Sequence, residues 1–175
     1  MASAMNEFVL SPAPRVHAEA LKSLLDAAVY REAIQDVIRR TGSDHANAEH
    51  QLIECLRYLY LLSVYPQQLT GLFLPVEQSI DDVWHYLILQ TREYRTLCEE
   101  RLPGHIFIEH RSLPYAEYQQ EPEREQLIEE ALRWLPLYRD TFGAFDEHAL
   151  PYWTMARFLR DQIGLSNAQI AALGN

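Results

Sequence analysis

The sequence predicts an all-α fold, a single compact domain (1–175) of six or seven helices. Along most of the chain, apolar residues recur at intervals of three and four, as on the buried face of a helix. The 175 residues are 48% hydrophobic, and a chain of this length buries roughly 70% of its unfolded surface without disulfide bonds. Strand-like character is confined to one short apolar β-branched stretch near residues 105–110. We therefore expect helices throughout and at most one extended segment.

The first part of the chain predicts two long helices. Residues 15–40 carry a continuous apolar stripe, and Gly42 follows as a stop signal. A second helix is expected to begin at a cap on Ser43 or Asp44 and to continue to Val64, where the following proline would end it.

A loop is predicted over residues 66–78, with Leu72-Phe73-Leu74 packed into the core. The third helix is expected to begin at Ser79, in a capping box with Asp82, and to end at Leu102-Pro103-Gly104. Further helices are predicted over 122–135, 151–163 and 166–174. The first has Pro122 in its first turn, is kinked or ended by Pro136, and is followed by a turn over 137–142. The last begins with a capping box of Ser166 and Gln169.

Composition limits the classes of partner. The chain has 25 acidic and 15 basic residues and a formal charge of −10, so a nucleic-acid partner is not expected, because phosphate contacts need clustered Lys and Arg. A protein partner or a small molecule fits this charge better. No apolar run approaches the ~18 residues that span a bilayer, and no signal peptide opens the chain. We expect a cytoplasmic protein with free thiols at Cys55 and Cys98. Residues 1–5 are expected to be disordered or not to belong to the native sequence, and so to form no part of the fold.

Asp81 and His85 carry the clearest chemical pattern. Four residues apart, they share one face of the third predicted helix. A carboxylate that accepts from one imidazole nitrogen leaves the other free to bind a metal or to act as a base. The structural alternative is an aspartate at a helix N-terminus and a histidine packed beside Trp84. His110, His50 or another carboxylate could complete a metal site with His85.

Cys98 lies further along the same predicted helix. In a straight helix with a rise of ~1.5 Å per residue, His85 and Cys98 would be about 20 Å apart, so they are not expected in the same metal site. Cys98 could instead join His105 or His110 after the chain turns. The alternative is that Cys98 is a buried apolar residue.

The run Ile80-Asp81-Asp82-Val83-Trp84-His85, followed by Thr91, Tyr94, Cys98 and His110, resembles the glycine-rich-domain-containing-protein-like family. Further matches extend the resemblance over about residues 50–155: Arg57-Tyr58-Leu59, Pro75, Tyr138, Phe142-Gly143 and Trp153. The resemblance implies a family but no activity. Many members have a second histidine two residues after the Trp-His pair, where this chain has Leu87, and this departure weakens a metal site.

The leading functional hypothesis is a non-catalytic helical module that binds a protein partner or a small molecule. Its site is predicted around Trp84, His85, Tyr94 and His110. Catalytic nucleophile motifs and phosphate-binding glycine loops are absent from the sequence, so no enzyme class is assigned.

Two alternatives stay open. The first is a metal-binding protein or metal-dependent enzyme, in which Asp81 orients His85, Cys98 or His110 is a second candidate ligand, and Zn or Fe is the metal. The second is an acidic inhibitor or immunity-type partner of a basic protein, which rests on charge and size.

Overall fold

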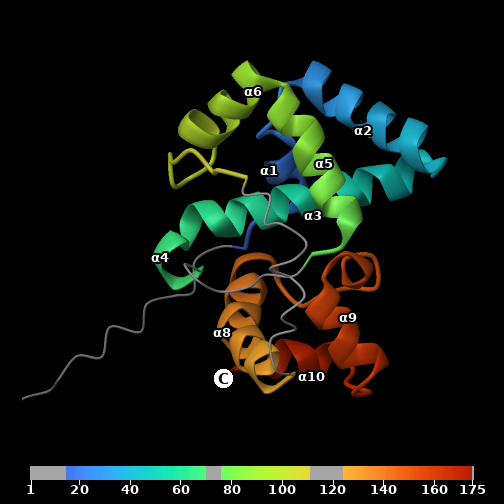
Figure 1. The fold of residues 1–175 in the computed structure, drawn as a ribbon, viewed down its shortest axis with the longest axis vertical. Helices are drawn as coiled ribbons and strands as arrows, with labels where there is room; N and C mark the ends of the chain where they lie inside the picture. Colours follow the sequence, from blue (N-terminus) through green and yellow to red (C-terminus); the bar gives the residue numbers. More distant parts are fainter. Residues whose placement is uncertain (1–14, 70–75, 111–123, 175) are drawn as a thin grey trace, which may run out of the picture.

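The computed structural model describes residues 15–69, 76–110 and 124–174 (Figure 1). Within these ranges the all-α prediction is confirmed: every element longer than one residue is helical, and extended pairing is limited to an isolated bridge between Val76 and Trp153. Residues 1–5, Leu72-Phe73-Leu74, Pro75 and Pro122 lie outside the described residues, so what the sequence predicts for them stays a prediction.

The described residues form nine α-helices, more than the six or seven predicted, because several predicted helices are broken or joined differently. The predicted helix over 15–40 is two helices, α1 (Ala18–Lys22) and α2 (Ala27–Thr41). The Ser23 hydroxyl group donates to the Ala20 carbonyl oxygen at 2.7 Å, and Asp26 takes an extended N-cap conformation. The break turns the chain so that α1 and α2 lie at an angle over the same core (Figure 1).

The predicted signals around α3 (His45–Val64) are confirmed at both ends. Gly42 ends α2 at φ +69°, a conformation that favours glycine. Of the two candidate caps, Asp44 is the one used, and its carboxylate accepts from the Asn47 backbone N–H at 2.8 Å. Pro66 opens a further short helix, α4 (Pro66–Leu69), inside the region predicted to be a loop.

The predicted helix from Ser79 to Leu102 consists of α5 (Gln78–Leu89), α6 (Thr91–Thr96) and the π-helical turn η1 (Leu97–Arg101). The break falls at Gln90, whose ψ of 59° is not helical. The predicted capping box at Ser79 is wrong, because the N-cap is Glu77 and no side chain caps the helix. The Asp82 carboxylate instead accepts from the Gln78 side chain at 3.0 Å.

The C-terminal part contains α8 (Arg124–Phe142), the 3₁₀ turn η2 (Leu150–Tyr152), α9 (Thr154–Asp161) and α10 (Asn167–Ala172). Of the two outcomes predicted at Pro136, a kink or an end, the end is wrong, as is the separate turn over 137–142, because α8 continues through the proline. Leu135 and Tyr138, on either side of it, are both buried in one cluster, and this packing outweighs the lost hydrogen bond. The capping box of Ser166 and Gln169 is confirmed.

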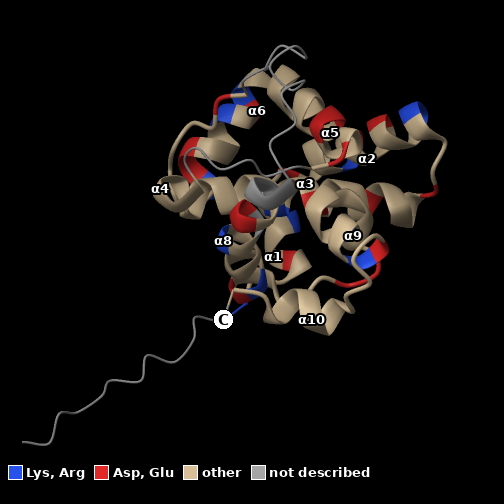
Figure 2. Cartoon of the chain, turned by 60° about the horizontal axis from the view of Figure 1, so that its bottom comes forward, with Lys and Arg blue, Asp and Glu red and all other residues tan. Residues whose placement is uncertain are grey.

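Helix α3 crosses the middle of the molecule (Figure 1). One apolar cluster packs α3 against α1, α2, α5 and α6, and a second packs its other side against α8, α9 and α10. Tyr58 joins the two clusters, with its ring 5.4 Å from that of Trp84 and 6.1 Å from that of Trp153. Among the described helices, none is both long enough and apolar enough to cross a membrane. Basic residues are dispersed among the helices in Figure 2.

Candidate metal centre

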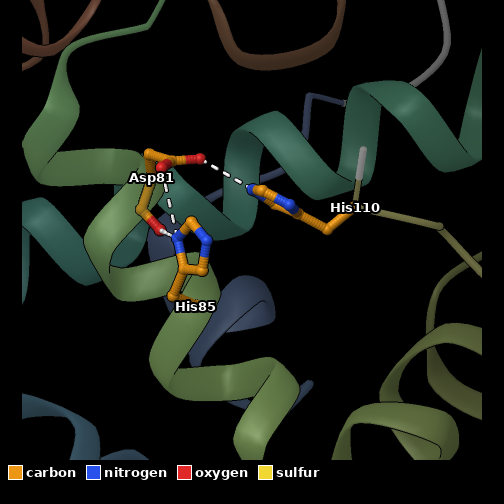
Figure 3. A group of neighbouring side chains, drawn as sticks. All are labelled: Asp81, His85 and His110. Atoms are coloured by element: carbon orange, nitrogen blue, oxygen red, sulfur yellow. Dashed lines mark hydrogen bonds and ion pairs between the residues drawn. The ribbon is translucent and has the colours of Figure 1, made fainter. Parts of the chain in front are cut away.

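Asp81 and His85 lie one turn apart on α5 and point to the same side of it (Figure 3). The Nδ1 atom of His85 is 2.8 Å from the backbone carbonyl oxygen of Asp81 and 3.2 Å from its carboxylate. In the neutral imidazole tautomer that carries its proton on Nδ1, this N–H donates to these oxygens and Nε2 is free to bind a metal. Histidines that bind metals are commonly oriented in this way, by a carbonyl or carboxylate on the other ring nitrogen.

The third member of the group comes from a different segment. Residues 105–110, here called the 105–110 segment, follow η1 without regular helical or strand pairing, so the short strand considered from the sequence does not form. This segment brings Nε2 of His110 to 2.8 Å from the Asp81 carboxylate, 29 residues away in sequence. The ring centroids of His85 and His110 are 4.2 Å apart, and both rings face Asp81 (Figure 3).

One ligand atom from each of Asp81, His85 and His110 lies within 4.8 Å of the other two. The side chains are graded in exposure, at 13% for His110, 32% for Asp81 and 50% for His85. The group is therefore anchored on the protein side and open to solvent on the His85 side. We call it the Asp81–His85–His110 group.

Buried hydrogen bonds hold the 105–110 segment in place. Trp84 Nε1 donates to the Tyr94 hydroxyl oxygen at 2.8 Å, and that hydroxyl donates to the Ile108 carbonyl oxygen at 2.7 Å. The Trp84 ring also packs edge-on against His110, with centroids 4.4 Å apart. Trp84 and Tyr94, both predicted to line a binding site, are buried. From the core side, they hold the segment that carries His110.

Cys98 lies beneath the same segment. Its side chain is fully buried, and both the Ile108 backbone N–H and the Tyr94 hydroxyl group interact with its sulfur. Burial raises the pKa of the Cys98 thiol. Cys98 is not a member of the Asp81–His85–His110 group.

The start of the segment is fixed by close packing against α3. The Gly104 backbone N–H donates to the Ser63 hydroxyl oxygen at 2.8 Å, and a Cβ on Gly104 would clash with the Ser63 carbonyl oxygen. His105 has φ +49° and its Nδ1 lies 3.0 Å from the Glu99 carbonyl oxygen. Both ends of the segment are therefore attached to helices.

Leu87 is buried at 2% exposure in the main core. At 3.6 residues per turn, position 87 lies about 200° around α5 from position 85. A histidine there would point into the core rather than toward Asp81. The presence of Leu87 in place of the second histidine of the family pattern therefore does not remove a ligand from the Asp81–His85–His110 group.

Sequence reasoning missed a second polar cluster, which lies in the core between α3 and the C-terminal helices. Glu54 is 4% exposed and accepts hydrogen bonds from Arg57 at 2.7 Å, Trp153 at 2.9 Å and Tyr138 at 3.2 Å. Burial raises the pKa of Glu54, and the Arg57 charge opposes this rise. Arg57, Tyr138 and Trp153 all match the family-like pattern, and this was the available signal. Glu54 belongs to no motif in the sequence.

Comparisons with protein-family models, with characterised proteins and with solved structures find no match for this chain. The resemblance to the glycine-rich-domain-containing-protein-like family therefore stays a prediction.

Proposed function

We propose that this protein binds a divalent transition-metal ion, Zn²⁺ or Fe²⁺, at the Asp81–His85–His110 group. The observation that carries the proposal is the convergence of two imidazoles and one carboxylate, from two separate segments, with ligand atoms within 4.8 Å of one another. The sequence placed Asp81 beside His85 as its orienting partner, and the geometry supports a further role for its carboxylate as a ligand.

The distances suit a metal. Zn²⁺ binds nitrogen and carboxylate oxygen at ~2.0–2.2 Å, which places two neighbouring ligand atoms about 3–3.5 Å apart. The His110 and Asp81 atoms are 2.8 Å apart, so a metal could replace the shared proton with a small movement. Imidazole ligands favour Zn²⁺ and Fe²⁺ over Mg²⁺ and Ca²⁺, which prefer oxygen.

The exposure of His85 gives the proposed centre an open side. Three protein ligands with a free position are typical of catalytic zinc sites, whereas structural zinc sites have four protein ligands. The free position would be available to water or to a small molecule. This arrangement favours the metal-binding alternative over the non-catalytic partner-binding module.

The test is elemental analysis of untagged protein purified without chelators, followed by titration of the metal-free protein with Zn²⁺ by calorimetry. Asp81→Asn, His85→Gln and His110→Gln should each lose most of the metal. Matched controls are Asp82→Asn, which changes the neighbouring carboxylate, and His105→Gln, which changes a histidine on the same segment; both should retain it. Binding to the wild type should release protons that the ligand variants do not release.

Two results would contradict the proposal. Equal metal content in the wild type and in all three ligand variants would place the metal elsewhere. Absence of metal from every sample, with no calorimetric signal, would return the search to a protein or small-molecule partner.

A further inference from the structure

We propose that metal occupancy of the Asp81–His85–His110 group keeps the 105–110 segment closed over Trp84, Tyr94 and Cys98, and that metal loss lets this segment open. The inference rests on the proposed function and adds to it a regulatory consequence. It identifies the element whose opening depends on the metal, and a buried residue that reports on it.

The three proposed ligands are divided between two structural elements. Asp81 and His85 share α5 and stay together whatever the 105–110 segment does. His110 belongs to the segment and reaches Asp81 only when the segment is docked. Opening therefore removes one of three ligands, so the metal binds the closed form more tightly and shifts the equilibrium toward it.

The segment buries little apolar surface. Ile108, at 7% exposure, is its one buried apolar side chain, whereas Ile106 is 38% and Phe107 46% exposed. The segment is attached to the core beneath by the hydrogen bond from Tyr94 to Ile108 and by the contact of the Ile108 N–H with the Cys98 sulfur. The rings of Phe107 and His110 add edge-on contacts with Tyr94 and Trp84. A region with little buried apolar surface opens at low free-energy cost compared with the core helices.

Cys98 is the reporter of this opening. The thiol is covered by Ile108 and has no exposed surface while the segment is docked. Cys55 is equally buried, but it lies on the central helix α3, so we expect its exposure to require unfolding of the core. The chain thus contains a matched internal control.

The size of the effect follows from mass action. A ligand that binds only the closed form reduces the open population by a factor of 1 + [M]/Kd, or about 100-fold at a metal concentration of 100 Kd. Weak binding by the Asp81–His85 pair in the open form would reduce this factor. A slowing of tenfold or more is therefore the expected result at saturation.

The experiment is alkylation of the native protein with iodoacetamide at constant pH, with the modification of each thiol followed by peptide mass spectrometry. Metal-free and Zn²⁺-loaded samples are compared, and their metal content is measured in parallel. Without metal, Cys98 should react faster than Cys55, and low urea should accelerate Cys55 more, because local opening exposes less surface than unfolding. Loading the metal should slow Cys98 at least tenfold in the wild type. In His110→Gln, added metal should leave the Cys98 rate unchanged.

The outcomes separate the two proposals. A loaded protein in which Cys98 reacts as fast as in the metal-free protein would overturn the inference and leave metal binding intact. Cys98 and Cys55 rates that match in metal-free protein, with equal urea dependence, would also overturn it, because opening would then be global. Failure of the protein to take up metal would remove the proposed function and this inference together.

Discussion

The Tyr94 hydroxyl group donates a hydrogen bond of 2.7 Å to the backbone carbonyl oxygen of Ile108. The same hydroxyl oxygen accepts from Trp84 Nε1, so one buried group connects α5, α6 and the 105–110 segment. Trp84, Tyr94 and His110 are spaced residues of the family-like pattern, and Trp84 contacts both of the others. Trp84 and Tyr94 thereby hold the segment that places His110 against Asp81.

Tyr94→Phe tests this arrangement. The change leaves the Ile108 carbonyl oxygen and the Trp84 indole N–H buried without a partner, and an unsatisfied buried polar group costs about 1–3 kcal/mol. We expect the free energy of unfolding, measured by urea denaturation, to fall by about that amount or more. Tyr86→Phe is the control, because that hydroxyl group has no hydrogen bond to the described residues. An equal, small effect in both variants would show that the Tyr94 bonds contribute little.

Gly104→Ala probes the start of the segment. An added Cβ would lie far inside contact distance of the Ser63 carbonyl oxygen, and Ser63 is buried on α3. Forcing an extra carbon into a packed site typically costs 1–3 kcal/mol. Thermal unfolding should show a clear loss of stability. An unchanged midpoint would mean that the turn can move away from α3 freely.

Glu54 accepts three hydrogen bonds in the core, and Glu54→Ala would leave the Arg57 charge buried without its partner. Removing one member of a buried ion pair costs about 3–5 kcal/mol. We expect a loss of this size in urea denaturation, or failure to fold. Glu129→Ala, at an exposed position of α8, should change stability by less than about 0.5 kcal/mol. A small effect at Glu54 would show that the core rearranges around Arg57.

The raised pKa of Glu54 also predicts a pH dependence. Because burial raises this pKa, the folded protein holds the Glu54 proton at pH values where the unfolded chain, with a pKa near 4.5, has released it. The resulting stabilisation is present below pH 4.5 and is lost as the pH rises through the folded pKa. Relative to Glu54→Gln, which does not titrate, the wild type should therefore lose stability as pH increases above 4.5. Urea denaturation of both proteins across this range measures the difference, and a slope of opposite sign would show that the Arg57 charge dominates.

Local sequence signals could predict part of the site. Helical spacing correctly placed Asp81 and His85 on one face, because that relationship depends only on α5. The position of His110 could not be derived, since it depends on the break at Gln90 and on an irregular segment held by tertiary contacts. The sequence therefore left His110 as one of several candidate partners.

The same contrast between local signals and tertiary contacts decides which features of the fold could be predicted. The caps at Asp44 and Ser166 were predictable, because a short polar side chain bonds to a backbone N–H three residues away. Whether α8 ends at Pro136 could not be predicted, because the burial of its neighbours Leu135 and Tyr138 decides whether the helix continues. These two caps involve only one turn of the chain, whereas the continuation of α8 depends on packing between residues far apart in the sequence.

Leu87→His tests whether the family's second histidine would belong to this centre. Leu87 is 2% exposed and faces the core, on the side of α5 away from His85. A histidine would lose apolar burial and bring in ring nitrogens without partners, at a cost of about 2–5 kcal/mol. We expect lower stability in urea and a Zn²⁺ affinity, measured by calorimetry on folded protein, within a few-fold of the wild type. Leu87→Met, which keeps the volume, should cost less than about 1.5 kcal/mol. A substantial gain in Zn²⁺ affinity for Leu87→His would mean that α5 rotates to present position 87 to the metal, and that the Asp81–His85–His110 group is a subset of a larger ligand set.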